Sequence, residues 1–194
     1  MAQPSVLTEE THDPSLGLFY RPVEDITPAI AIEHTLFPED EAGSPEYIKM
    51  RQEQAPSLFL GAYTSSKEDK GDGLDKGRLV AFIMATLAET EHLTEASMKE
   101  HHPEGRLVCL HSVCVDSPWQ GMGYAKAILR EFIRRVQEIV LEDGKTPRYR
   151  AIALLTHKPL IHLYTQVGFT LLGPSTITHG PDLWYDMELP ILPK

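Results

Sequence analysis

The chain has 194 residues, of which 42% are hydrophobic and 24% are charged. This length fits one domain of ordinary size, and the composition excludes a disordered or membrane-spanning chain. The 18 basic and 28 acidic residues give a net charge of −10, which argues against binding a nucleic-acid backbone, because phosphate contacts need a basic face. An acidic chain suits a cationic substrate, although it also favours solubility.

Targeting and redox signals predict a cytoplasmic protein. The start Met1-Ala2-Gln3-Pro4 lacks the basic and apolar segments of a signal peptide, and the longest apolar run, residues 79–85, is too short to span a bilayer. Cys109 and Cys114 lie five apart in one predicted strand, so we expect their side chains on opposite faces and no bridge between them. A reducing compartment fits this cysteine usage.

The first third of the chain begins with polar residues, so we expect a flexible N-terminal tail over residues 1–15 and a single domain over residues 16–194. A strand is predicted over residues 16–23. Proline follows both Thr27 and Ser44, which predicts a helix starting at each of these two positions; the second helix extends to about Gln54.

The middle of the chain contains three predicted strands, over residues 57–63, 78–88 and 106–115. The second is almost continuously apolar, which indicates burial on both faces. The polar, glycine-containing stretch 65–73 is predicted to be an inserted hairpin loop, and residues 94–100 a short helix.

The clearest helix comes next, because apolar residues recur with helical spacing from Ala125 to Val140, before Asp143-Gly144 ends it. The last part of the chain predicts a strand over 150–155, a helix over 160–167 and strands over 169–173 and 183–189. Strands and helices therefore alternate around one sheet, which predicts an α/β domain.

The turn between the strand 106–115 and the long helix is the strongest candidate ligand site. Glycines there let backbone N–H groups approach an anion, and the helix dipole adds partial positive charge. The spacing fits neither a Walker loop nor a Gly-x-Gly-x-x-Gly fingerprint. A glycine-lined turn without a ligand remains the alternative.

This turn, Gln120-x-x-Gly123-x-Ala125, resembles the signature of the GCN5-related N-acetyltransferases, and Leu163-Tyr164-x-x-x-Gly168-Phe169 is similar to their second signature. Four further stretches resemble the arylalkylamine (serotonin) N-acetyltransferase branch: residues 77–83, 93–97, 110–115 and 173–178. The resemblance covers most of residues 16–190. It implies the fold of that family, a central mixed, mostly antiparallel sheet of about six to seven strands flanked by helices.

The resemblance also implies acetyl-CoA as co-substrate, a small-molecule amine as acceptor, and no metal. The backbone of Val113, Cys114 and Val115 would pair with the pantetheine arm. The pyrophosphate would lie on the turn, whose members are Gln120, Gly121, Met122, Gly123, Tyr124 and Ala125.

Acetyl transfer needs a neutral amine, and a histidine can accept the proton of an ammonium ion. The resemblance assigns this role to His111 and assigns protonation of the leaving thiolate to Tyr164. As alternatives, His111 is a hydrogen-bonded strand residue and Tyr164 a core aromatic residue. Phe37, Pro45 and Leu155 are the candidate substrate-binding residues.

The chain departs from the branch pattern in several places. Cys109 replaces the first of two strand histidines, His157 stands where an acidic residue is expected, and no phosphorylation-dependent partner site is evident in the tails. These changes leave open a non-catalytic acetyl-CoA-binding module, and the acids Glu39, Asp40 and Glu41 leave open a polyamine acceptor. A zinc hydrolase is disfavoured because His101, His102, His157 and His162 show no usual ligand spacing, and we expect His157 and His162 on the surface.

Overall fold

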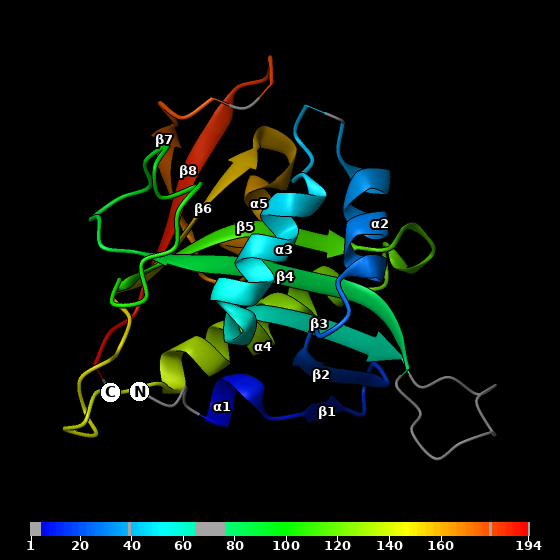
Figure 1. Ribbon diagram of the computed structural model, residues 1–194, viewed down its shortest axis with the longest axis horizontal. Helices are drawn as coiled ribbons and strands as arrows, with labels where there is room; N and C mark the ends of the chain where they lie inside the picture. Colours follow the sequence, from blue (N-terminus) through cyan, green and yellow to red (C-terminus); the bar gives the residue numbers. More distant parts are fainter. Residues whose placement is uncertain (1–4, 39, 65–76, 179, 194) are drawn as a thin grey trace.

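The computed structural model describes residues 5–38, 40–64, 77–178 and 180–193. Within these ranges an eight-stranded sheet has the order β1-β2-β3-β4-β5-β6-β8-β7 (Figure 1). Its strands are β1 (Thr11–Asp13), β2 (Leu18–Pro22), β3 (Phe59–Thr64), β4 (Arg78–Ala88), β5 (Leu107–Val115), β6 (Ala151–His157), β7 (Thr170–Pro174) and β8 (Trp184–Pro190). Neighbouring strands are antiparallel except β5 and β6, which are parallel. The predicted mixed, mostly antiparallel α/β fold is confirmed, with β1 bringing the strand count above the predicted six to seven.

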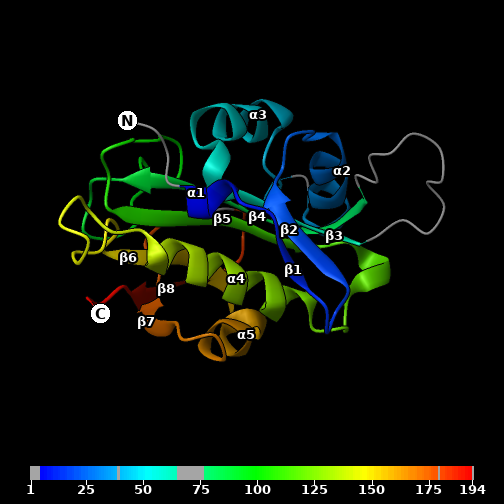
Figure 2. The ribbon, with the colours of Figure 1, turned by 90° about the horizontal axis from the view of Figure 1, so that it is seen from below.

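Helices cover both faces of the sheet (Figure 2). Helices α2 (Thr27–Leu36) and α3 (Pro45–Gln54) lie over one face, and α4 (Tyr124–Glu138) and α5 (Ile161–Thr165) lie over the other. The side chains of α4 that pack against the sheet are Ile128, Leu129, Phe132 and Val136. On the opposite face, Ile32 and Ile48 pack with Phe82 of β4. Strand β4 is therefore buried on both faces, as its apolar sequence predicts.

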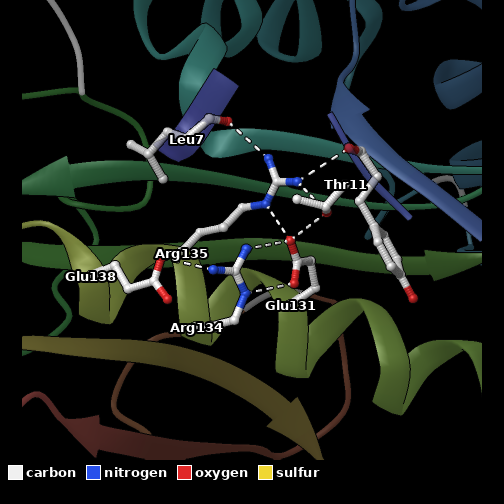
Figure 3. A network of polar contacts seen from close by, with 7 residues as sticks. Leu7, Thr11, Glu131, Arg134, Arg135 and Glu138 are labelled. Carbon is white, nitrogen blue, oxygen red and sulfur yellow. Dashed lines mark hydrogen bonds and ion pairs between the residues drawn. The ribbon is translucent and has the colours of Figure 1, made fainter. Parts of the chain in front are cut away.

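The N-terminal segment differs from the predicted flexible tail. Leu7 of α1 (Ser5–Thr8) is 2% exposed, and β1 pairs with β2. The guanidinium of Arg135, on α4 and 1% exposed, donates hydrogen bonds to Leu7 O, Thr11 Oγ1 and Tyr20 O (Figure 3). Buried Arg135 therefore binds this segment to α4. The polar composition of residues 1–15 does not predict this packing.

Glu131 is the carboxylate partner of Arg135, at 2.7 Å between Oε1 and Nε, and it also accepts hydrogen bonds from Thr11 and Arg134 (Figure 3). Burial alone would raise the pKa of Glu131, but the hydrogen bonds from Arg134, Thr11 and Arg135 lower it to about 2. Glu131 is thus ionised at neutral pH, and its contacts with Arg135 and Thr11 fix the N-terminal segment to the same helix that begins at the glycine turn.

Two predicted elements end or fold differently. Residues 94–100 form turns rather than a helix, because Thr94 and Ser97 bond each other's backbone amides through their hydroxyl oxygens, which competes with helical bonding. Helix α4 ends at Glu138 rather than near Asp143-Gly144, because the chain beyond it turns back and Val140 bridges Pro147. The predicted inserted loop 65–73 lies outside the described residues. None of the described helices is long and apolar enough to cross a membrane.

Candidate active site

Strands β5 and β6 pair over only part of their length. The parallel ladder joins residues 107–110 to residues 151–154, whereas β5 continues to Val115 and β6 to His157. Beyond Leu110 and Leu154 the two strands separate (Figure 1). The edge of β5 that faces β6 is therefore free of strand pairing over its last residues, while its other edge remains bonded to β4.

A bulge in β5 begins this separation. Met84 of β4 pairs with Ser112 and the next residue, Ala85, pairs with Leu110, so His111 is the extra residue. The bulge shifts the alternation of β5, and the prediction that Cys109 and Cys114 point to opposite faces is wrong. Cys114 packs with Met84 and Cys109 with Ala88, two residues that share a face of β4. Both thiols are buried and free.

A cavity of about 250 Å³ lies at the separation of β5 and β6. Five of the predicted residues line it together: Phe37, His111, Val113, Leu155 and Tyr164. Pro45 is not among the lining residues. It begins α3, and its neighbours Ser44 and Tyr47 contribute to the wall instead.

His111 is held by β4. Its Nε2 lies 2.7 Å from Thr86 Oγ1, and the residue is partly exposed. Cys109, two residues earlier, is completely buried among alanines and does not line the cavity. Burial raises the pKa of its thiol to about 12, so Cys109 stays protonated at neutral pH and does not replace an imidazole as a base.

Tyr164 enters the cavity from the opposite face of the sheet. It lies on α5, packs edge-on against Phe169 with ring centroids 5.8 Å apart, and is 6% exposed. Burial, and secondarily the nearby Cys114, raise the pKa of the Tyr164 phenol well above its usual value. The phenol therefore keeps its proton over the whole working pH range and is available as a donor.

The glycine turn lies at the end of β5. Gly121 and Gly123 have φ of 77° and 85°, and a Cβ at either position would meet nothing within 4 Å. The first helical hydrogen bond of α4 runs from Ala127 N to Gly123 O, so the amides before Ala127 precede the helical ladder. Gln120 Nε2 donates to Val115 O at 3.0 Å, which ties the turn to β5. The turn thus presents backbone amides and the positive end of a helix beside an open strand edge.

A sequence profile described as the acetyltransferase (GNAT) family matches residues 29–169, close to three quarters of the chain and inclusive of His111 and Tyr164. The chain belongs to this family. Its sequence is similar to that of the serotonin N-acetyltransferase of Mesocricetus auratus, with 31% identity over 114 residues, 59% of this chain and 52% of that protein. The Macaca mulatta serotonin N-acetyltransferase is 27% identical over 160 residues, 81% of this chain and 70% of that protein.

The chain thus spans about half the length of the Mesocricetus auratus protein that it matches. Among solved structures, Arabidopsis thaliana NAA60 in complex with acetyl-CoA is similar with a TM-score of 0.64 and 19% identity, covering 90% of this chain and 99% of that one. This likeness shows the fold alone. Among the described residues of the chain, no group of three or more His, Cys, Asp or Glu side chains is placed to hold a metal ion.

Two candidate functional residues were not predicted from the sequence. Glu33 of α2 is 2% exposed, lines the cavity and accepts a hydrogen bond from Gly43 N at 2.9 Å; burial raises the pKa of its carboxyl group. His157, expected on the surface, lines the same cavity. The predicted strand ends at Leu155, and its extension by two residues would have placed His157 on the same face as that residue.

Proposed function

We propose that this acetyltransferase moves the acetyl group of acetyl-CoA to the primary amine of a small arylalkylamine, by direct attack within a ternary complex. The observation that carries the proposal is the meeting of His111 and Tyr164, from opposite faces of the sheet, in one cavity where β5 and β6 separate. Acetyl-CoA supplies the thioester, and the side chains and backbone of this chain bind it and transfer protons during the reaction.

Acetyl-CoA is placed by the backbone. The free edge of β5 from Val113 to Val115 offers amide and carbonyl groups to the pantetheine arm, as an added strand would use them. The amides of residues 121–125 and the α4 dipole suit the pyrophosphate, and the open space around Gly121 and Gly123 leaves room for it. Gln120 acts on the turn itself, since its side chain already bonds Val115 O.

The reaction needs three proton transfers. His111 takes one proton from the acceptor ammonium, and the electron pair stays on the nitrogen. That nitrogen bonds to the acetyl carbon, the carbon–sulfur bond breaks, and the nitrogen releases its second proton to solvent. Tyr164 donates its hydroxyl proton to the departing thiolate and regains one from solvent. An acetyl-cysteine intermediate is not required, and the buried Cys109 and Cys114 thiols are poor nucleophiles because burial raises the pKa of each.

The cavity wall favours an aromatic amine. Phe37, Leu155, Tyr47 and Trp184 supply apolar and aromatic surface around the space that His111 reaches. Such a wall suits an indole or phenyl ring. The names of the relatives, serotonin N-acetyltransferases, support the same class of acceptor.

A polyamine is the second candidate. The acids Glu33, Asp40 and Glu41 also line the cavity and would attract a second positive charge. Glu39, the first of the three loop acids singled out in the sequence, lies outside the described residues.

A panel of acceptors tests the proposal: tryptamine, phenylethylamine, spermidine and a lysine-rich histone peptide, each with acetyl-CoA, with free thiol release as the readout. We expect the two arylalkylamines to give the highest kcat/KM. A higher kcat/KM for spermidine would contradict the arylalkylamine proposal and identify a polyamine as the acceptor. Binding of acetyl-CoA without thiol release for any amine would leave a non-catalytic binding module.

A further inference from the structure

His157 is a polar cavity residue that has no role in the proposed mechanism. Its Nε2 lies 3.0 Å from Glu41 Oε2, and the two side chains are 25% and 6% exposed. The imidazole packs on the indole of Trp184, with ring centroids 3.8 Å apart. All three side chains line the cavity that contains His111 and Tyr164.

Three separate parts of the fold fix this group. The pairing of β6 with β8 sets His157 opposite Trp184. Glu41 lies in a turn, where both its own amide and that of Ala42 bond Pro38 O. Glu33 bonds the nearby Gly43 amide and so anchors the same loop to α2. The imidazole is therefore oriented by its surroundings rather than free to rotate into solvent.

The strand that carries His111 offers no second base, because the Cys109 thiol is buried outside the cavity. A carboxylate that accepts a hydrogen bond from one imidazole nitrogen fixes the tautomer and leaves the lone pair on the other nitrogen. It also stabilises the imidazolium that proton uptake creates. The Glu41–His157 arrangement meets both conditions inside the cavity.

We propose that His157, oriented by Glu41, is a second proton acceptor for the amine substrate and acts beside His111. The N–H bond of the ammonium breaks, the proton that His111 would otherwise take moves to His157 Nδ1, and the electron pair stays on the amine nitrogen; Glu41 Oε2 holds the opposite ring nitrogen, Nε2. Other charged or titratable groups lie in the same cavity or next to His157 in the sheet and chain: Glu33, Asp40, Tyr47, Arg51, Lys99, His111 and Tyr164 in the cavity, Lys158 next in the chain, and Tyr185 and Asp186 on β8. This inference rests on the proposed arylalkylamine acetyltransferase activity.

The test compares two amines of similar shape and different basicity: phenylethylamine and 2,2-difluoro-2-phenylethylamine, whose fluorine atoms lower the ammonium pKa towards neutrality. The variants are His157→Gln, Glu41→Gln and the control His162→Gln, which changes an exposed histidine of α5 bonded to Gln166. For phenylethylamine at neutral pH we expect kcat/KM to fall on the order of tenfold to a hundredfold in His157→Gln, and less in Glu41→Gln. For the difluoro amine, which needs little proton removal, we expect the fall to shrink to less than about threefold.

An unchanged KM for acetyl-CoA and an unchanged melting temperature would show that the His157→Gln cavity is intact. Equal losses with both amines would overturn the proposal, because a purely structural wall residue affects both alike. No loss with either amine, or the same loss in His162→Gln, would also overturn it. If the wild-type enzyme acetylates neither amine, the proposed function fails and this inference with it; if the wild type is active, the outcome concerns His157 alone.

Discussion

At the scale of single residues, the bulge at His111 limits which side-chain positions can be predicted from the sequence. His111, Tyr164, Phe37, Val113 and Leu155 are identifiable from motifs and local patterns, and they line one cavity. The face of the sheet on which Cys114 lies cannot be predicted in this way, because one extra residue in the bulge reverses the alternation of the residues that follow it. The place of His157 in the cavity is also hard to predict. It requires a strand that extends two residues beyond its apolar run, and a partner, Glu41, that lies 116 positions away in the sequence.

Tyr164→Phe should lower kcat for tryptamine on the order of a hundredfold or more, while the affinity for acetyl-CoA stays nearly the same. The substitution removes the proton donor and keeps the ring that packs on Phe169. Steady-state kinetics and a binding titration with acetyl-CoA measure the two effects.

Tyr149→Phe is the matched control, because burial also raises the pKa of Tyr149 but its ring lies outside the cavity. It should retain the wild-type kcat. Full turnover in Tyr164→Phe would remove Tyr164 from the proton-transfer role.

At the scale of elements, helix α4 connects the glycine turn at its start with the buried Glu131–Arg135 pair in its second half. Its first turn carries the amides proposed for the pyrophosphate, and its last turns carry Glu131 and Arg135, which hold the N-terminal segment (Figure 3). The helix itself is predictable from its apolar period. The packing of residues 5–13 against α4 is not predictable, because it depends on Arg135, which is 1% exposed. Arginine is usually found on the surface, so the sequence gives no sign that this one is buried.

Gly123→Asp should raise the KM for acetyl-CoA strongly, whereas Gly123→Asn should raise it much less. Asp and Asn have the same shape and both tolerate the left-handed conformation that Gly123 adopts, at φ 85°. Only Asp adds a negative charge where the anionic pyrophosphate is proposed to bind, and a Cβ there meets no other atom within 4 Å. Equal KM values in the two folded variants would contradict an anion site at this turn.

Glu131→Gln should destabilise the protein by roughly 3 kcal/mol at pH 7, because it leaves the buried Arg135 without its carboxylate. The native pKa of Glu131, about 2, lies below its ordinary value, so its contribution is present at neutral pH and decreases as the pH falls towards about 2. Urea unfolding at pH 7 and pH 3 should therefore show a smaller difference between variant and wild type at the lower pH.

Glu138→Gln serves as the control for this prediction, because Glu138 bonds only the more exposed Arg134 among the contacts described. It should change the free energy of unfolding by less than about 1 kcal/mol. A pH-independent difference for Glu131→Gln would contradict the ion pair.

At the scale of the whole molecule, the fold creates the site by separating two strands that begin as parallel neighbours. Strands β5 and β6 share four paired positions and then diverge, so helices on opposite faces of the sheet can contribute Tyr164 and Glu33 to the same space. The α/β class and most element boundaries are predictable from periodicity and turn residues. The separation itself is a long-range property of register, which local sequence patterns do not encode.

This arrangement predicts that both substrates occupy the site together, with the amine attacking the thioester directly. Initial rates of thiol release, measured over a grid of acetyl-CoA and tryptamine concentrations, test that claim most directly. We expect double-reciprocal lines that intersect, and one N-acetyltryptamine formed for each CoA released. Parallel lines, which indicate an acetyl-enzyme intermediate, or thiol release that does not depend on tryptamine, would contradict it.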